Sequence, residues 1–308
     1  MRAINNIFES VSLTDGKEYQ LRIKGKVLKG VRGEYNPLSV GDTVEFEPYS
    51  ETEGLIISRN ERKSIFQRWN VKEKLNQTIA ANMDQVVIVT SINSPPFRPK
   101  FLDRALACAD GCPCLIVINK MDLGISEWDE SFIDLYESLG YEVIQTSKDS
   151  DLEELKMHLR GKVSAFVGQS GVGKSSLINA LTGSTQRTGE IVEKYNRGRH
   201  TTNHSLYIHR DEYDIIDTPG VREILVPLED LSLVKESFPE LRGLECEFQG
   251  CMHTPGERGC EVPGLLEEGI IDEDRYESYL KILESLSERS PKYMRTKKAE
   301  QVKTGKKG

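Results

Sequence analysis

Short apolar stretches separated by Gly-containing turns characterise residues 20–68. The stretches read QLRIKGKVLKG, SVGDTVEFEP and EGLIISRNERKSIF, and short runs of this kind between turns predict β-strands. In the first stretch the apolar positions alternate with Arg22, Lys24 and Lys26, so this strand has one apolar and one basic face. The pattern predicts an all-β module of small-barrel size, whose basic face is either solvated or a surface for nucleic acid.

Longer apolar runs alternate with amphipathic segments from about residue 71 onwards. Five runs end in polar residues or Gly, as buried parallel strands do: DQVVIVTSI, CLIVINK, YEVIQTS, KVSAFVGQ and YDIIDTPG. Segments such as KFLDRALACAD and DLEELKMHLRG lie between them, and their apolar residues are spaced as in amphipathic helices. This alternation predicts a doubly wound α/β domain, which binds its ligands at the carboxyl ends of the strands.

The chain after residue 230 is helical and rich in Gly and Cys, and then helical again through EDRYESYLKILESLSER. It ends in the basic segment 292–307, which we expect to be disordered and either to contact RNA phosphates or only to keep the protein in solution. We therefore predict three parts, at residues 1–70, 71–230 and 231–308.

The bulk composition is that of a soluble globular protein. A chain of 308 residues fits two or three domains. With 29% charged and 37% hydrophobic residues, it has neither the composition of a disordered protein nor a membrane-spanning run, and its first residues lack a signal-peptide pattern. We expect a cytoplasmic protein. A net charge of −8 argues against a generally basic nucleic-acid coat but leaves room for local basic faces.

The segment GQSGVGKS matches the P-loop pattern GxxxxGK(S/T), follows the apolar run VSAFV and precedes the helical SLINALTG. Backbone amides near its glycines can approach phosphates, and the following helix N-terminus favours anions. Lys174 would reach the β- and γ-phosphates, and the Ser175 hydroxyl would hold Mg²⁺. The predicted phosphate-binding residues are Gly168, Gln169, Ser170, Gly171, Val172, Gly173, Lys174, Ser175 and Ser176.

Another strand end carries DTPG, where a P-loop NTPase places a second Mg²⁺-linked carboxylate and an amide that senses the γ-phosphate. These roles fall to Asp217 and Gly220. The segment follows SLYIHR and YDIID, which read as a pair of adjacent strands.

The segment NKMD ends the run CLIVI and suits guanine. A carboxylate can accept from the ring N–H and the exocyclic amine of guanine, an arrangement that adenine lacks. The residues assigned to this role are Asn119, Lys120 and Asp122. The later TSK, with Ser147 and Lys148, resembles the loop that completes the guanine pocket in Ras-like GTPases.

The order of these loops along the chain is unusual, because the guanine loops come before the P-loop and DTPG. This is the Ras-like order cut and rejoined at a new point. A domain whose termini lie close together tolerates such a permutation, which leaves every strand-end loop in the same place in space.

Six cysteines form two groups. Cys108, Cys112 and Cys114 surround an apolar run and are expected to be buried thiols without a function. The second group has the spacing C-x4-C-x-H-x6-C, which offers three thiolates and one imidazole to a tetrahedral Zn²⁺; its members are Cys246, Cys251, His253 and Cys260. Four protein ligands leave no open position, so this zinc would be structural, with one ion per chain.

The permuted order, with a β-module ahead and a Cys/His cluster behind, resembles the RsgA family of circularly permuted, small-ribosomal-subunit-dependent GTPases over about residues 20–285. The resemblance implies a fold of class α/β. A circularly permuted Ras-like P-loop GTPase domain would be flanked by an N-terminal OB-fold barrel and a C-terminal helical zinc-binding domain. It also implies GTP, GDP and Mg²⁺ as ligands, the small ribosomal subunit and its rRNA as partners, no membrane association, and a monomer.

A first switch is implied by the family motif GxHTT, which this chain matches at Gly198, His200, Thr201 and Thr202, with Asn203 where a third Thr is common. One of the two Thr would reach Mg²⁺ and the γ-phosphate; the sequence leaves open which. A Val stands just after DTPG and cannot orient water, so the resemblance makes His200 the candidate for positioning the attacking water. The predicted catalytic residues are His200, Lys174, Thr201 and Thr202.

Three functions fit these features. The first is a GTPase that binds the small ribosomal subunit, couples hydrolysis to late subunit maturation and its own release, and is slow until the subunit orders the switch. The second is an RNA-binding assembly factor in which nucleotide only stabilises the fold. The third is a small-molecule kinase, against which the guanine loops and the lack of a recognisable substrate lid argue.

Overall fold

The computed structural model describes residues 2–4, 7–25, 28, 35–183, 205–221, 223–227 and 230–289. The predicted switch residues His200, Thr201 and Thr202 therefore lie outside the described residues, as do Lys26 and the basic segment 292–307.

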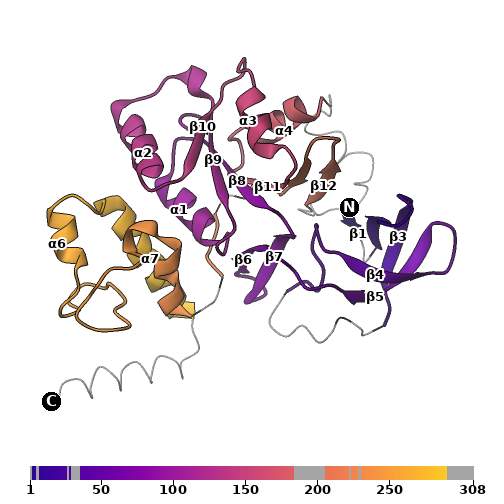
Figure 1. The fold of residues 1–308 in the computed structure, drawn as a ribbon, viewed down its shortest axis with the longest axis horizontal. Helices are drawn as coiled ribbons and strands as arrows, with labels where there is room; N and C mark the ends of the chain where they lie inside the picture. The colour runs from indigo at the N-terminus through magenta and orange to yellow at the C-terminus, as the bar shows by residue number, and fades with distance from the viewer. Residues whose placement is uncertain are drawn as a thin grey trace, which may run out of the picture.

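A five-stranded sheet forms the N-terminal part, in the order β1-β2-β3-β5-β4 (Figure 1). Two of its strands lie ahead of the region in which the sequence predicts strands. Leu21 and Ile56 are fully buried between the strands, whereas Arg22 is exposed. The strands are β1 (Arg2–Ile4), β2 (Ile7–Val11), β3 (Glu18–Ile23), β4 (Val44–Pro48) and β5 (Glu53–Arg59).

The central sheet has six strands in the order β10-β9-β8-β11-β13-β12. Its first five are parallel, and only the edge strand β12 is antiparallel to its neighbour. The five apolar runs of the sequence are these parallel strands, so the predicted doubly wound domain is confirmed. The strands are β8 (Gln85–Ser91), β9 (Cys114–Asn119), β10 (Glu142–Gln145), β11 (Val163–Gly168), β12 (Leu206–His209) and β13 (Asp214–Asp217).

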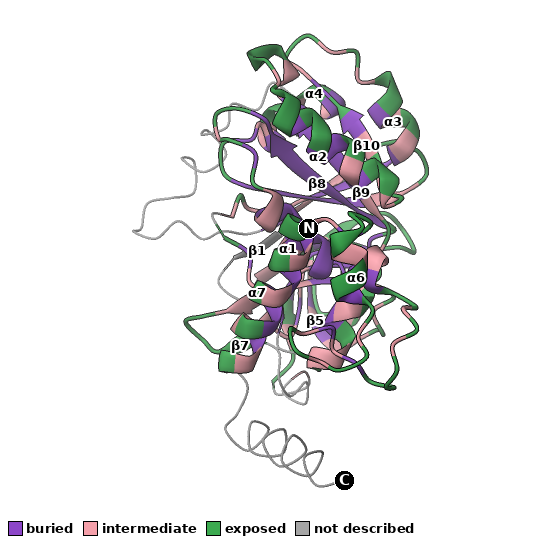
Figure 2. Ribbon diagram, turned by 90° about the vertical axis from the view of Figure 1, so that its left-hand side faces the viewer, coloured by how far each residue is buried: buried purple, intermediate pink, exposed green. Residues whose placement is uncertain are grey.

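Helices cover both faces of this sheet, so its central strands are buried on both sides (Figure 2). Val86 and Ile88 of β8 pack in the hydrophobic cluster that contains α1 and α2. Val87 and Val89 pack in a second cluster with α3 and α4. Successive residues of a strand point to opposite faces, which explains why these runs are apolar at every position. The helices are α1 (Pro99–Ala107), α2 (Glu127–Ser138), α3 (Glu153–Leu159) and α4 (Lys174–Thr182).

The hairpin β6 (Ile65–Asn70) and β7 (Leu75–Ala81) stands between the two sheets (Figure 1). The predicted boundary between residues 70 and 71 falls inside this hairpin. Phe66 and Ala80 belong to the same hydrophobic cluster as α1, which ties the hairpin to the central domain.

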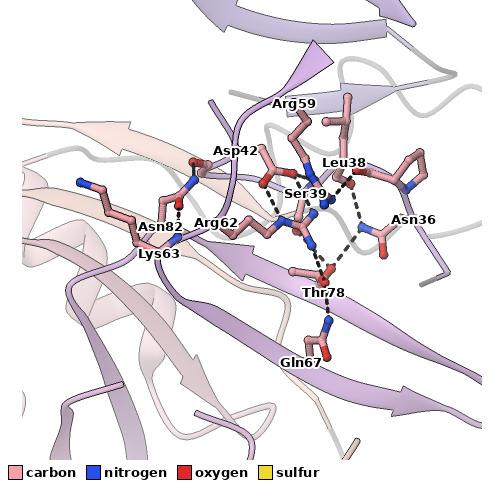
Figure 3. A network of polar contacts seen from close by, with 12 residues as sticks. Asn36, Leu38, Ser39, Asp42, Arg59, Arg62, Lys63, Gln67, Thr78 and Asn82 are labelled. Atoms are coloured by element: carbon pink, nitrogen blue, oxygen red, sulfur yellow. Dashed lines mark hydrogen bonds and ion pairs between the residues drawn. The ribbon is translucent and has the colours of Figure 1, made fainter. Parts of the chain in front are cut away.

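A buried polar network joins the N-terminal sheet to the hairpin (Figure 3). Arg62 donates from Nε and Nη2 to the two carboxylate oxygens of Asp42 at 2.7 and 2.8 Å, and from Nη1 to the Thr78 hydroxyl at 3.1 Å. The Asn82 amide donates to the Gly41 carbonyl oxygen at 2.9 Å. Side-chain exposures of only 6% and 2% for Arg62 and Asp42 make this a buried, paired contact rather than a surface salt bridge.

The C-terminal part is mainly helical and packs against the central domain through α7 and α1 (Figure 1). Its elements are the 3₁₀ turns η2 (Leu231–Ser237) and η3 (Pro239–Leu241), and the helices α6 (Val262–Glu267) and α7 (Glu273–Arg289). Among the described residues, no helix combines the length and the apolar character needed to cross a membrane.

Candidate nucleotide site and metal centre

The P-loop connects the end of β11 to the start of α4. Gly171 and Gly173 have φ angles of +89° and +95°, which glycine adopts without a steric penalty. A Cβ atom at Gly168 would lie 2.5 Å from the Val89 carbonyl oxygen, so a side chain there would collide with backbone. The loop thus presents its backbone at the N-terminus of α4, where N–H groups attract anions.

Lys174 links the P-loop to DTPG. It is only 6% exposed, and its ammonium group contacts the Asp217 carboxylate and the Thr218 carbonyl oxygen. The backbone N–H of Val221 donates to the Gly168 carbonyl oxygen at 3.2 Å. These contacts hold the Asp and Gly of DTPG beside the phosphate-binding loop.

The NKMD loop is fixed against the P-loop. The Asn119 amide group donates to the Val172 carbonyl oxygen at 3.0 Å, and its own oxygen accepts from the Thr146 hydroxyl at 3.1 Å. Lys120 donates from Nζ to the Gly171 carbonyl oxygen at 2.5 Å and also to the Ser94 carbonyl oxygen. Thr146 is the first residue of the predicted loop TSK, whereas the sequence did not single out Ser94, because its contact crosses between strands that are distant along the chain.

The two guanine loops are also joined to each other. The Met121 N–H donates to the Thr146 carbonyl oxygen at 3.1 Å, and the Lys148 N–H donates to Asp122 Oδ1 at 3.3 Å. Asp122 is exposed, so its carboxylate is accessible to a ligand.

The predicted nucleotide residues therefore converge on one edge of the sheet. The loops come from the carboxyl ends of β9, β10, β11 and β13, where an open α/β sheet binds its ligands. Apart from the switch residues, the predicted residues from Asn119 to Gly220 that were assigned to nucleotide or Mg²⁺ are described, and they lie in these loops or in the first turn of α4. The P-loop can hold phosphates, Ser175 and Asp217 can provide a hydroxyl and a carboxylate for a cation, and Asp122 can provide a carboxylate for a nucleobase.

A second cluster lies in the C-terminal part and is formed by Cys246, Cys251, His253 and Cys260. Their potential ligand atoms all lie within 4.8 Å of one another. The Cys246 and Cys260 sulfur atoms are 3.5 and 3.7 Å from His253 Nδ1. Three sulfur atoms and one imidazole nitrogen gathered this closely form a group that could hold a metal ion, and the donor set suits Zn²⁺.

Burial shifts the pKa values of ionisable groups in this cluster. Burial raises the pKa of the Cys251 and Cys260 thiols and lowers that of the His253 imidazole. A divalent cation would offset the raised thiol pKa by stabilising the thiolates, and a neutral imidazole is the form that binds metal. The backbone at His253 is held from α7, because the Tyr276 hydroxyl donates to its carbonyl oxygen at 2.7 Å.

Glu257 is a further member of this loop that the sequence did not single out. Its carboxylate accepts from the Cys251 thiol at 2.9 Å and from the Met252 N–H at 2.8 Å. Its position between His253 and Cys260 in the sequence is the signal that could have pointed to this residue. Outside this cluster, burial raises the pKa of Cys112 to about 11 and of Cys114 to about 12, which leaves them as neutral thiols.

Comparisons with known proteins agree with this geometry. A family model described as RsgA GTPase matches residues 59–227. The small ribosomal subunit biogenesis GTPase RsgA of Borreliella burgdorferi (strain ZS7) is 41% identical over 291 residues, covering 92% of this chain and 94% of that protein. The protein of the same name from Chlorobaculum parvum is 40% identical over 297 residues, covering 90% and 94%.

Two solved structures are similar over most of the chain. YjeQ from Thermotoga maritima has 30% sequence identity and a TM-score of 0.68, covering 92% of this chain and 95% of that one. YloQ, a circularly permuted GTPase, has 28% identity and a TM-score of 0.67, covering 94% of each chain. The circular permutation and the three-part fold class predicted from the sequence are thereby confirmed.

Proposed function

This chain belongs to the RsgA GTPase family and hydrolyses GTP, and from this premise we propose that it couples hydrolysis to late maturation of the small ribosomal subunit and to its own release. A role in ribosome biogenesis agrees with the names of its relatives. The observation that carries the proposal is the convergence of the P-loop, DTPG and both guanine loops on one edge of the sheet.

Each loop has a proposed task. Asn119 and Asp122 select guanine, and the P-loop amides with Lys174 bind the phosphates. Ser175 holds Mg²⁺ together with Asp217, which lies beside Lys174 in this structure. Bound Mg²⁺ would supply a positive charge that neutralises charge developing on the phosphates.

Hydrolysis by the isolated protein should be slow. Val221 follows DTPG, and its isopropyl group can neither orient nor deprotonate the attacking water. We assign this role to His200, with Thr201 or Thr202 at the Mg²⁺ and γ-phosphate. Ordering of the first switch by the small subunit would then accelerate hydrolysis.

In this proposal the N-terminal and C-terminal parts of the chain provide the contacts to the small ribosomal subunit. The N-terminal barrel offers Arg22, an exposed cation, to rRNA. Lys24, the residue just after this strand, is paired with Glu47 at 2.7 Å, so the basic face is partly neutralised. The Cys/His cluster holds a structural Zn²⁺ that fixes the loops of the C-terminal part.

The test is GTP hydrolysis with and without purified small ribosomal subunits, for wild type and His200→Ala, with subunit binding measured in parallel. We expect strong stimulation of wild type, and loss of stimulation in a variant that still binds the subunit. Absence of stimulation in wild type would refute the coupling. It would leave an RNA-binding protein in which GTP hydrolysis serves another purpose.

A further inference from the structure

A large cavity borders the nucleotide site, where the starts of α1, α2 and α7 approach the P-loop residue Gln169. Its volume is about 680 Å³. Most of its wall comes from aromatic and basic side chains, and the rest from one proline, one amide and two carboxylates. The residues central to its chemistry are Trp128, Phe97, Arg98, Gln169, Glu223 and Asp274. Of its wall residues, only Gln169 belongs to the nucleotide site, as part of the P-loop.

Trp128 provides an aromatic surface in the cavity wall. The residue is 51% exposed, although its ring is supported by edge contacts to Phe132 and Phe97 with centroid separations of 4.6 and 6.3 Å. An indole that is held from behind and open in front loses little side-chain freedom when a flat ligand stacks on it. Every nucleobase offers such a flat face.

Arg98 provides an available cation beside this surface. It is exposed, and within the described part of the chain its guanidinium makes no ion pair or hydrogen bond. The neighbouring cations are engaged, since Lys100 pairs with Glu277 at 2.5 Å and Arg104 with Glu223 at 3.4 Å. A guanidinium without a carboxylate partner is suited to a phosphate.

Gln169 adds a hydrogen-bonding group to the wall. Its side chain is 6% exposed, and its amide oxygen is buried without a hydrogen-bond donor in the described part of the structure. Buried polar atoms are nearly always paired, so this acceptor is unusual. A small rotation of the amide would allow it to accept from a ligand amine, and exocyclic amines occur on three of the four RNA bases.

We propose that this cavity binds one unpaired nucleotide of single-stranded RNA. Its base stacks on Trp128, its phosphate lies at Arg98, and an exocyclic amine donates to Gln169. This rests on the proposed rRNA partner and names a contact surface for it. Asp274 in the same wall would repel the closely spaced phosphates of a duplex, so the site fits one nucleotide with about one phosphate contact.

Tryptophan fluorescence tests the proposal directly, because the chain has only two Trp. Trp69→Phe leaves Trp128 as the single indole. Short single-stranded RNA should quench the fluorescence of this indole saturably. The logarithm of the binding constant should fall with the logarithm of the salt concentration with a slope of about −0.7, the value for about one phosphate contact. Arg98→Glu should weaken binding at least about tenfold, the value of a charge-assisted hydrogen bond. Arg258→Glu, an exposed cation outside the cavity wall, is the matched control and should bind as before.

The inference is overturned if RNA causes no saturable quenching, or if Arg98→Glu leaves the quenching unchanged. Equal quenching by an acidic peptide would also overturn it, in favour of a protein partner. Failure of the proposed function is recognised separately, because it appears as absent stimulation of the unaltered protein by whole subunits. Circular dichroism of each variant verifies that the fold is retained.

Discussion

Replacing Arg275 by Met should strongly destabilise the joint between α7 and the central domain. The Arg275 side chain is 1% exposed, contacts the Asp103 carboxylate, and donates to the two carboxylate oxygens of Glu240 at 2.7 and 3.1 Å. Asp103 and Glu240 are themselves only 1% and 7% exposed. The substitution therefore leaves two buried carboxylates without their cation.

The expected loss is about 3–5 kcal/mol of unfolding free energy, the usual cost of breaking a buried ion pair by removing one partner. The guanidinium also lies 4.6 Å from the centre of the Phe238 ring, a cation–π contact of about 1–2 kcal/mol that is not additive with the first figure because it involves the same group. Met fills much of the space left by the Arg stem, so the lost charge accounts for most of the effect.

The loss should depend on pH, and the sign follows from Asp103. Burial raises the pKa of its carboxyl group, and the charge of Arg275 opposes that rise. Without Arg275 the folded-state pKa rises further above the unfolded value of about 3.9. Stability that is fully present below the unfolded pKa is then lost as the pH rises through the folded pKa. The variant should therefore be closer to wild type at about pH 5 than at about pH 8.

Urea unfolding followed by far-ultraviolet circular dichroism measures this difference at both pH values. Arg242→Met, at an exposed arginine of the same C-terminal part, serves as the matched control and should lose less than about 1 kcal/mol. The double variant Arg275→Met/Asp103→Asn should recover part of the loss. An Arg275→Met protein as stable as the control at about pH 8, or one equally destabilised at both pH values, would refute the reasoning.

Three further predictions concern the nucleotide and metal sites. Asp122→Asn should weaken GTP binding about 10- to 100-fold and improve binding of xanthosine triphosphate, measured by competition with a fluorescent nucleotide, because it removes a charged acceptor for guanine. Gly173→Ala should weaken GTP binding at least about tenfold, since its φ of +95° and the nearby Asn119 amide both disfavour a side chain, whereas Gly140→Ala, with a φ of +86° and open space, should not. Cys251→Ser should lower bound zinc, measured by atomic absorption, from about one ion per chain towards none and lower the melting temperature, while Cys108→Ser leaves the zinc content unchanged.

The central domain was predictable because its signals are local. The strands β8, β9 and β11 are buried on both faces, and this burial produces the continuous apolar runs. The loops that follow them carry short motifs in which each residue type has a chemical reason. Position at a strand's carboxyl end then implies proximity in space, even though the loops are far apart along the chain.

Other features depend on contacts that no local pattern encodes. The hairpin β6–β7 was divided between two predicted domains because the pattern of apolar runs changes at about residue 71, whereas Phe66 packs into the core of the central domain. The strands at residues 2–4 and 7–11 were missed because they are short and only partly apolar. The ion pair of Arg275 with Asp103 joins residues 172 positions apart, so neither helix predicts it alone.

The segment that follows DTPG touches two other parts of the molecule at once. The Leu225 carbonyl oxygen accepts from the Trp69 N–H at 2.8 Å, in the hairpin. The Val226 carbonyl oxygen accepts from Arg289 at the end of α7 at 2.9 Å, and the same guanidinium lies 5.3 Å from the centre of the Trp69 ring.

These contacts give the permutation a mechanical consequence. The hairpin is bonded through Thr78 to Arg62 at the buried joint with the N-terminal sheet. We infer that a displacement of Gly220 on loss of the γ-phosphate would act, five residues later, on a segment bonded both to the hairpin and to α7. In the unpermuted order the chain would continue from DTPG into the rest of the GTPase domain, and only the cut found here makes the C-terminal part the direct continuation of the phosphate-sensing loop.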